Sequence, residues 1–316
     1  MVPRILSTGR YIPERCVSND ELSARLDTSD EWIFSHTGIK TRYLAADNET
    51  TSSLALRAAQ AALERAGKAP GEVDLILVAT GSPDYPGFPS CASIVQEQLG
   101  CSQAAAMDVV AACSGFVYAV ETARSFLVSG AARLVLVIGS EVFSRILDWS
   151  DRATCILFGD GAGAVLLGTD EGLPPNGDFR RSLLMSDGSG AETLTSRQAH
   201  SPYLFMNGRR VYNFAIKIVP ELVGKILSEN GLALDDLRWI VPHQANARII
   251  ESTAKGLGIP LNRFYMNIAR YANTSGASIP IALDEMNEKG LLKRGDWVLL
   301  VGFGAGLTAG VNLFRW

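Results

Sequence analysis

The chain has 316 residues, of which 47% are apolar, and its formal net charge at pH 7 is −4. These values are typical of a globular protein with a large core, and they exclude an extended basic surface for nucleic acid. No apolar run reaches the roughly 18 residues that a membrane span needs. The N-terminal stretch MVPRILSTGRYIPERC also lacks the apolar segment of a secretory signal. The sequence therefore predicts a protein with neither nucleic-acid nor membrane partners.

The cysteines are odd in number, irregularly spaced and without a C-x-x-C pair: Cys16, Cys91, Cys101, Cys113 and Cys155. This usage argues against a disulfide framework and against a structural zinc site. It favours a reducing, cytoplasmic setting. The chain also has no G-x-x-x-x-G-K-[ST] phosphate loop, and its glycine clusters lack the G-x-G-x-x-G spacing of a dinucleotide fold. We expect neither a metal nor a bound cofactor.

Apolar runs and amphipathic segments alternate through the first half of the chain. In order, the pattern predicts a short helix with a capped polar segment in 18–42, a helix at 51–67, a buried strand at 73–80, a helix near 92–99, a strand at 107–112, a helix ending at 130, a strand at 134–142 and two strands within 155–167. The turn-forming stretch EGLPPNGDF, at 171–179, is the best candidate for a linker.

The pattern then starts again. A strand near 182–187, a helix at 211–230, a strand at 239–241, two further turn-and-helix units and two closing strands are predicted. The segment 73–82 matches 237–246 in its role, and 133–142 matches 296–305, so the α/β unit is duplicated. We expect two halves, 1–170 and 171–316, each with a buried sheet covered by helices.

Cys113 lies where a predicted strand breaks at Cys-Ser-Gly and a helix begins. The first N–H groups of a helix have no partners inside it, and the macrodipole places partial positive charge there. Both effects favour a thiolate, so we expect the pKa of Cys113 to fall and the sulfur to be a nucleophile. The same N–H groups can stabilise an oxyanion. A small buried cysteine beside a core helix remains the alternative.

His243 and Asn273 also lie in turns that precede predicted helices. A helix N-terminus disfavours imidazolium, so a neutral His243 can donate through Nε2, and Asn273 can donate from its amide. Two neutral donors beside a nucleophilic sulfur suit an enolate formed from a thioester. Taken alone, His243 is also compatible with a structural histidine and Asn273 with a helix cap. The functional interpretation depends on the three residues acting together.

The whole chain resembles the β-ketoacyl-acyl-carrier-protein synthases III of the thiolase superfamily. The resemblance is carried by DTSDEWI (27–33), TGI (37–39), DVVAACSGF (108–116), DRATCILFGDGAGA (151–164), VPHQANARII (241–250), NTSGASIP (273–280) and GFGAG (302–306). It implies a thiolase-like α/β fold with duplicated βαβαβαββ halves in α-β-α-β-α layers. It also implies an acyltransferase that condenses acyl-coenzyme A with malonyl-carrier protein to give 3-oxoacyl-carrier protein, CO2 and coenzyme A, initiating fatty acid biosynthesis.

The resemblance also implies residue roles. Cys113 accepts the acyl group, while His243 and Asn273 stabilise the enolate after malonyl decarboxylation. The remaining implied sites are an oxyanion hole at Cys113, Gly304, Ala305 and Gly306; coenzyme A contacts at Trp32, Arg152, Tyr212 and Asn246; a carrier-docking segment at Gln244, Ala245, Asn246, Ala247 and Arg248; and Phe88, which closes the acyl pocket of the partner subunit in a homodimer.

The chain departs from the family pattern at a few of these sites. His36 stands where an arginine beside the coenzyme A phosphates is common, and Asn213 stands at a basic carrier-docking position. Within the fold, a synthase III homologue of secondary metabolism, making a polyketide starter, a quinolone or an ester, is the alternative function. A cysteine-dependent thioester hydrolase and a non-catalytic acyl-binding protein represent other classes. The chain lacks the C-G-[SA]-C-[WY] block of papain-like proteases.

Overall fold

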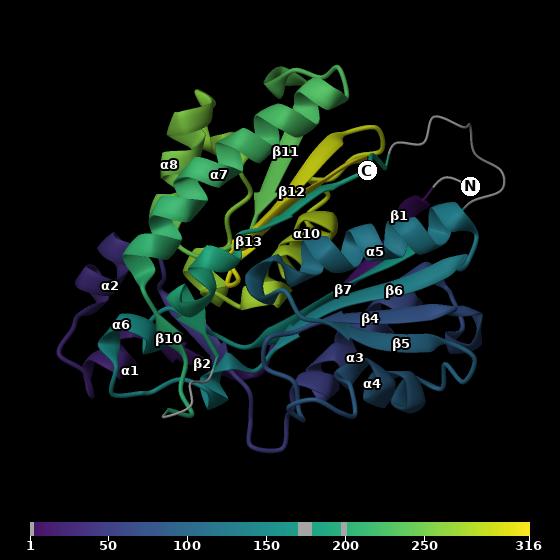
Figure 1. Cartoon of the computed structure of the whole chain (residues 1–316). Helices are drawn as coiled ribbons and strands as arrows, with labels where there is room; N and C mark the ends of the chain where they lie inside the picture. Colours follow the sequence, from purple (N-terminus) through teal and green to yellow (C-terminus); the bar gives the residue numbers. More distant parts are fainter. Residues whose placement is uncertain (1–2, 170–178, 197–200) are drawn as a thin grey trace.

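Two large β-sheets and three layers of helices make up the body of the molecule, and two further sheets have two strands each. The computed structural model describes residues 3–169, 179–196 and 201–316. Figure 1 shows α5 and α10 between the two sheets, α3 and α4 outside the first sheet, and α7 and α8 outside the second. This arrangement confirms the α-β-α-β-α layering expected from the sequence.

The first sheet has the strand order β1-β7-β6-β4-β5. Its strands are β1 (Pro3–Tyr11), β4 (Leu75–Ala79), β5 (Ala105–Val109), β6 (Leu134–Glu141) and β7 (Gly161–Thr169). β6, β4 and β5 run parallel, whereas β7 is antiparallel to both β1 and β6. The helices are α3 (Thr51–Ala66), α4 (Cys91–Leu99) and the central α5 (Gly115–Ser129). β4 and β6 are buried along their whole length because helices cover both faces.

The second sheet repeats this plan with the order β11-β12-β13-β8. Its elements are β8 (Leu183–Ser186), α7 (Gly208–Glu229), β11 (Leu237–Pro242), α8 (Ala247–Leu257), α10 (Ser278–Glu288), β12 (Trp297–Gly304) and β13 (Thr308–Arg315). β11 and β12 are parallel, and β13 is antiparallel to both of its neighbours. The counterpart of β5 is reduced to one parallel bridge between Ile240 and Phe264. The pairs proposed from the sequence, β4 with β11 and β6 with β12, occupy equivalent positions.

Smaller elements gather at one end of the molecule, beside the central helices. They are β2 (Arg15–Ser18), α1 (Asn19–Ser23), α2 (Asp30–Thr37), β3 (Thr41–Leu44), α6 (Arg152–Cys155), β9 (Leu194–Thr195), β10 (Phe205–Met206) and α9 (Ile268–Tyr271). Ser29 caps α2 by accepting a hydrogen bond from the Trp32 N–H at 3.1 Å. No helix of the described chain is long and apolar enough to cross a lipid bilayer.

Some sequence expectations were wrong in detail. The segment 155–167 was expected to form two strands, but its start belongs to α6 and only β7 follows. Asp151 caps α6 by accepting from the Ala153 N–H at 2.9 Å, which ends the extended pattern there. β1 and the β2–β3 hairpin were not expected. Residues 170–178, with the division at 170/171 and most of the linker candidate, lie outside the described residues.

Candidate active site

Cys113 lies in the 3-10 turn Ala112–Ser114, between the end of β5 and the start of α5. The preceding residue, Ala112, has a left-handed backbone with a φ of 44°. This conformation turns the chain sharply and is strained for a residue with a Cβ. Cys113 is 5% exposed, and its Sγ donates to the Ser275 Oγ at 3.4 Å. The strand–turn–helix arrangement expected from the sequence is therefore present.

The lowered pKa expected for Cys113 is not found. Burial raises the pKa of the Cys113 thiol to about 12, and the neighbouring carboxylate of Glu141 also raises it. The helix-start argument omitted the cost of placing a negative sulfur in a closed cavity without a cation nearby. Cys113 is a thiol at neutral pH in the unliganded protein. Its proton has to leave as the sulfur attacks, rather than before.

His243 follows β11 directly and is held on two sides. Its backbone N–H donates to the Val301 carbonyl at 2.7 Å, and its Nδ1 lies 2.7 Å from the Ser278 Oγ. The Gln244 N–H donates to the same Ser278 oxygen at 3.3 Å. We therefore assign the Ser278 hydroxyl as the hydrogen-bond donor and His243 Nδ1 as the acceptor. In this tautomer the ring proton is on Nε2. Burial lowers the pKa of His243 to about 3, so the ring is a neutral donor.

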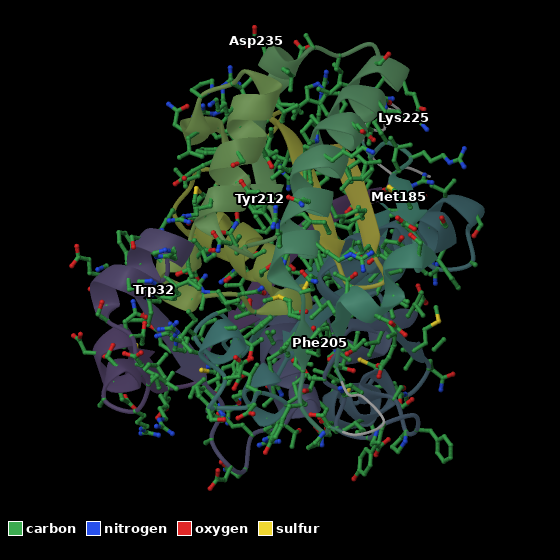
Figure 2. All side chains as sticks on the ribbon, turned by 60° about the vertical axis from the view of Figure 1, so that its left-hand side comes forward. Trp32, Met185, Phe205, Tyr212, Lys225 and Asp235 are labelled. Atoms are coloured by element: carbon green, nitrogen blue, oxygen red, sulfur yellow. The ribbon has the colours of Figure 1, made fainter. Side chains whose placement is uncertain are left out.

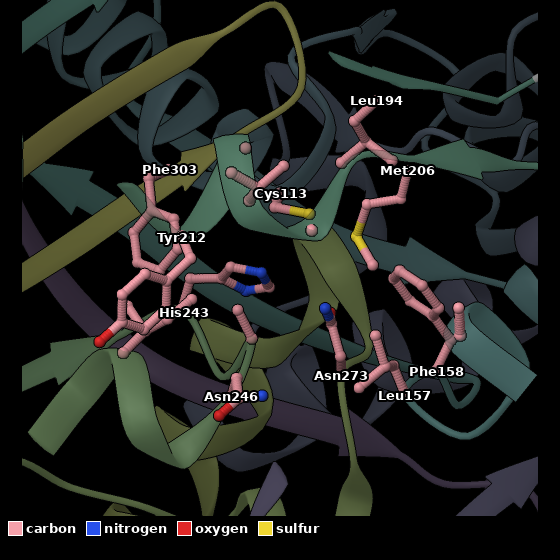
Figure 3. Close-up of a pocket in the computed structure, with 16 residues that line it drawn as sticks. Cys113, Leu157, Phe158, Leu194, Met206, Tyr212, His243, Asn246, Asn273 and Phe303 are labelled. Atoms are coloured by element: carbon pink, nitrogen blue, oxygen red, sulfur yellow. The ribbon is translucent and has the colours of Figure 1, made fainter. Parts of the chain in front are cut away.

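Asn273 lies in the turn before α10. Its Oδ1 accepts a hydrogen bond from the Ser275 N–H at 2.8 Å. Its backbone N–H donates to the Leu157 carbonyl at 2.9 Å. With Oδ1 occupied, the amide nitrogen remains free to donate. Figure 3 shows this nitrogen, the His243 ring and the Cys113 sulfur directed toward one space. The structure thus brings together the three residues that the sequence singled out.

Two cavities meet at Cys113. The first, of about 240 Å³, contains His243 and Asn273. The second, of about 400 Å³, also reaches Cys113 and is lined mainly by apolar and small residues, among them Phe143 and Leu204. Cys113 therefore adjoins both the cavity that contains the two donors and a second, larger cavity. An acyl group on the sulfur could occupy the apolar chamber while a second substrate approached the donors.

The glycine loop at the end of β12 passes directly beside Cys113. A Cβ added to Gly304 would lie 2.8 Å from the Cys113 Cβ, which no real side chain could tolerate. Glycine is required here by close approach. Ala305 and Gly306 follow in the turn between β12 and β13, and both line the second cavity. Gly304 thus lies against Cys113, and Ala305 and Gly306 line a cavity that Cys113 also lines; their role as an oxyanion hole stays a prediction.

Trp32 and Arg152 are adjacent, as the resemblance implied. The Arg152 guanidinium lies 4.9 Å from the centroid of the Trp32 ring and also donates to the Asp27 carbonyl. The His36 ring stacks on Trp32 with a centroid separation of 4.2 Å. At these separations no base fits between Arg152 and Trp32, so an adenine requires the Arg152 side chain to swing outward. Figure 2 shows Trp32 at the periphery of the molecule.

Tyr212 and Asn246 line the first cavity, as their expected contact with coenzyme A requires. The Tyr212 hydroxyl lies 2.8 Å from the Ser252 Oγ. The Asn246 side chain caps α8 by accepting from the Arg248 N–H at 2.8 Å, and it donates to the His36 carbonyl at 3.1 Å. Asn246 therefore joins the cavity wall to α2, which carries Trp32.

The expected carrier-docking segment divides into exposed and buried residues. Gln244 is 1% exposed, and its amide donates to the Pro242 and Tyr265 carbonyls. Ala247 is also buried. These two side chains are therefore not available to a protein on the surface, and the docking role of the segment stays a prediction. Arg248 is exposed, and its guanidinium donates to the Ser35 carbonyl at 2.8 and 3.2 Å.

Sequence reasoning missed Ser275, Ser278 and Glu141. These residues contact Cys113, His243 and the turn before α10, respectively. Glu141 is fully buried at the end of β6 and accepts from the Ser82 Oγ at 2.6 Å and from the Gly276 N–H at 3.3 Å. Burial raises the pKa of Glu141 to about 7. The two serines stand within the quoted NTSGASIP motif, so the motif itself was a usable signal. Nothing in the pattern marked Glu141.

No group of three or more His, Cys, Asp or Glu side chains suited to a metal ion occurs in the described ranges. The groups that the cavity brings together are a thiol and two neutral N–H donors, beside the backbone of the glycine loop. Such a set can accept an acyl group and then stabilise an enolate in the same cavity. Among duplicated α-β-α-β-α proteins, this combination defines the condensing acyltransferases of the thiolase fold.

Comparison with known proteins identifies the family. The family model described as 3-Oxoacyl-[acyl-carrier-protein (ACP)] synthase III matches residues 107–188, and its C-terminal counterpart matches residues 227–316. A β-ketoacyl-[acyl-carrier-protein] synthase III from Clostridium acetobutylicum is 48% identical over 99% of this chain and 98% of its own length. One from Sinorhizobium medicae is 47% identical over 98% and 97%.

A solved structure agrees. The crystal structure of 3-oxoacyl-[acyl-carrier-protein] synthase III from Aquifex aeolicus is 43% identical and has a TM-score of 0.95, covering 99% of this chain and all of that one. The chain belongs to the β-ketoacyl-acyl-carrier-protein synthase III family, whose members are condensing acyltransferases of fatty acid synthesis. This membership confirms the resemblance, and it favours the first functional interpretation over the alternatives from secondary metabolism and hydrolysis.

Proposed function

We propose that this protein transfers an acyl group from acyl-coenzyme A to Cys113 and condenses it with malonyl-carrier protein. The observation that carries the proposal is that two neutral donors, His243 and Asn273, share one cavity with Cys113, while a second cavity, lined mainly by apolar and small residues, also reaches Cys113. Each donor has its opposite end fixed, by Ser278 and Ser275 respectively. The donors are therefore oriented before substrate arrives, as electrostatic stabilisation of a developing charge requires.

In the first half-reaction the Cys113 sulfur attacks the thioester carbonyl of acyl-coenzyme A. The bond between the carbonyl carbon and the coenzyme A sulfur breaks, and the thiol proton ends on that sulfur. Backbone N–H groups of Cys113 and of the glycine loop stabilise the oxyanion. Because the pKa of Cys113 is about 12, proton transfer accompanies the attack.

In the second half-reaction the malonyl thioester replaces coenzyme A beside the donors. The bond to the carboxylate carbon breaks and CO2 leaves. The electron pair forms an enolate whose oxygen accepts from His243 Nε2 and the Asn273 amide. The enolate carbon then attacks the acyl carbon, and the bond from that carbon to the Cys113 sulfur breaks. The departing sulfur takes up one proton from water, which restores the Cys113 thiol. A neutral His243 suits this step, because an imidazolium could protonate the carbanion.

The same proposal includes a homodimer. β5 is the edge strand of the first sheet, and its outward groups have no partner strand among the described residues. Val110, directly after β5, is 81% exposed, and Phe88, in the loop before α4, is 91% exposed. An open edge with exposed apolar side chains is typical of an interface. Val110 also lines the second cavity, so a partner subunit's loop at this edge would close the acyl chamber. The expected action in the cytoplasm, on an acidic carrier protein, belongs to the same proposal.

Intact-mass measurement after incubation with acetyl-coenzyme A tests the proposal. We expect a stable increase of one acetyl group, absent from Cys113→Ala, which disappears when malonyl-carrier protein is added and 3-oxoacyl-carrier protein forms. A thioester hydrolase would instead release acetate without accumulating the adduct. Loss of the adduct in water at the rate of its formation, with no condensation product, would contradict the proposal.

A further inference from the structure

Two buried hydroxyl groups join the Cys113 turn to the glycine loop, and neither has a place in the reaction described above. Thr308 is the first residue of β13, and Ser114 follows the nucleophile. Their oxygens lie 2.6 Å apart. The Thr308 Oγ1 lies 2.7 Å from the Ala305 carbonyl, and the Ser114 Oγ lies 2.8 Å from the Ala111 carbonyl. Each hydroxyl has one proton, so the two hydroxyls can donate only two of these three hydrogen bonds. With Thr308 donating to the Ala305 carbonyl and Ser114 donating to Thr308, a hydrogen-bonded path runs from one half of the molecule to the other.

The contact between Thr308 and the Ala305 carbonyl also sets the direction of the Gly306 N–H. The Ala305 C=O and the Gly306 N–H belong to one peptide group, and this peptide is trans. In a planar trans peptide the two bonds point in opposite directions. Fixing the Ala305 oxygen on Thr308 therefore directs the Gly306 N–H away from Thr308. No hydrogen bond to another backbone group in the described residues uses that N–H.

The rest of the loop is fixed independently. The Leu307 N–H donates to the Asp187 carbonyl at 2.9 Å, and the Asp187 N–H donates to the Leu307 carbonyl at 2.7 Å. The Ala305–Gly306 peptide has no such backbone clamp. Among the described contacts of this peptide, the Thr308 hydroxyl is the group that sets its orientation. At 9% exposure, Thr308 has little water to replace a lost hydrogen bond.

We propose that Thr308 is a positioning residue for the acylation half-reaction, holding the Ala305–Gly306 peptide so that the Gly306 N–H faces the thioester oxyanion. The inference rests on the proposed function, because it assigns a task within the first half-reaction. It places no demand on the second, whose donors His243 and Asn273 are held by Ser278 and Ser275. Thr308 should therefore affect the two half-reactions unequally.

The test compares Thr308→Val, which keeps the shape and removes the hydroxyl, with Thr308→Ser, which keeps the hydroxyl. We expect Thr308→Val to lower the maximal rate constant of self-acylation by acetyl-coenzyme A about 10- to 100-fold, because the donor is misaligned rather than lost. The acetyl-coenzyme A concentration that gives half of this rate should change little. Thr308→Ser should retain most of the rate. Ser114→Ala is the matched control, because it leaves the contact between Thr308 and Ala305 in place.

A second measurement separates positioning from general damage. Malonyl-carrier protein decarboxylation is compared in Cys113→Ala and in the double variant Cys113→Ala/Thr308→Val, and we expect equal rates. A parallel loss of decarboxylation would overturn the inference, as would an equal loss of acylation in Thr308→Ser and Thr308→Val. Wild-type acylation rates in Thr308→Val would overturn it while leaving the proposed function intact. A wild-type protein that never acylates Cys113 would overturn both.

Discussion

The two central helices begin with the same backbone device and carry different chemistry. α5 follows the 3-10 turn Ala112–Ser114, and α10 follows the 3-10 turn Ser275–Ala277. The first residue of each turn has a positive φ, 44° at Ala112 and 46° at Ser275. After that residue the first turn places Cys113, whereas the second places Gly276. A Cβ on Gly276 would lie 3.4 Å from the Ala112 carbonyl, so the two turns meet.

The difference shows how a duplicated fold divides one reaction. The first turn presents a nucleophile, and the second presents the Asn273 donor together with Ser275, which contacts the sulfur. His243 comes from the second half as well. The nucleophile therefore comes from the first half and the two donors come from the second, while residues of both halves line the chamber beside the sulfur. Neither half has a complete site without the other.

Removing either the nucleophile or one of the two donors tests this division, and these substitutions should have the largest effects. Cys113→Ala should abolish acylation while leaving slow malonyl decarboxylation. His243→Ala and Asn273→Ala should acylate but lose about 10²–10³-fold in condensation, because each removes one preorganised donor. Rapid-quench acylation and CO2 release measure the two half-reactions separately.

One outcome would reverse the assignment. If His243→Ala lost acylation as severely as Cys113→Ala, with decarboxylation unharmed, His243 would be the base for the thiol. Ser278→Ala sharpens the choice, because Ser278 holds Nδ1 and so decides which ring nitrogen is protonated. We expect Ser278→Ala to resemble His243→Ala in kind and to have a smaller effect.

The division was visible in the sequence because both turns interrupt strong patterns. Cys113 stands between a strand signal and a helix signal, and Asn273 stands in a turn just before a helix signal; periodicity locates such breaks well. β1 was missed, and so was the β2–β3 hairpin, whose strands have only four residues each. The wrong pKa for Cys113 has a different cause: local sequence shows a helix start but not the depth of the cavity around it. Glu141 escaped for the same reason, since its donors come from Ser82 and Gly276 far along the chain.

Trp32, from the first half, should serve the first half-reaction. Stacking of an aromatic ring on a base contributes about 1–3 kcal/mol, so Trp32→Ala should raise the KM for acetyl-coenzyme A roughly 5- to 150-fold. The control is acetyl-pantetheine, which lacks the adenine and should show no change between the variant and the wild type. A raised KM for both thioesters would mean that α2 is displaced rather than that a stacking surface is lost.

Arg248, from the second half, should serve the second half-reaction. Arg248→Glu should slow reaction with an acidic malonyl-carrier protein about tenfold at low salt and less at high salt, as expected for a rim charge. Lys225→Glu, at the far end of α7 in Figure 2, provides the same charge change away from the cavity. Arg248 also donates to the Ser35 carbonyl of α2. Arg248→Gln keeps a donor, so a KM for acetyl-coenzyme A that is raised in Arg248→Glu but not in Arg248→Gln would point to α2 instead of the carrier.

The smallest effect concerns the buried titratable group of each half, and the two should act in opposite directions with pH. The pKa of Glu141 is raised from 4.5 to about 7, so its contribution to stability is complete below pH 4.5 and is lost as pH rises toward 7. The pKa of His243 is lowered from 6.5 to about 3, so the unfolded chain binds a proton first and stability is lost as pH falls below 6.5. Between these values the two contributions oppose each other.

Glu141→Gln should therefore steepen the loss of unfolding free energy on acidification, and His243→Gln should flatten it. Denaturant unfolding at a series of pH values measures how the unfolding free energy of each variant changes with pH. A hydrogen bond that a variant loses at every pH shifts this curve as a whole and does not change its slope. Slopes that changed in the same direction would show that at least one of these groups titrates normally and is less enclosed than its surroundings indicate.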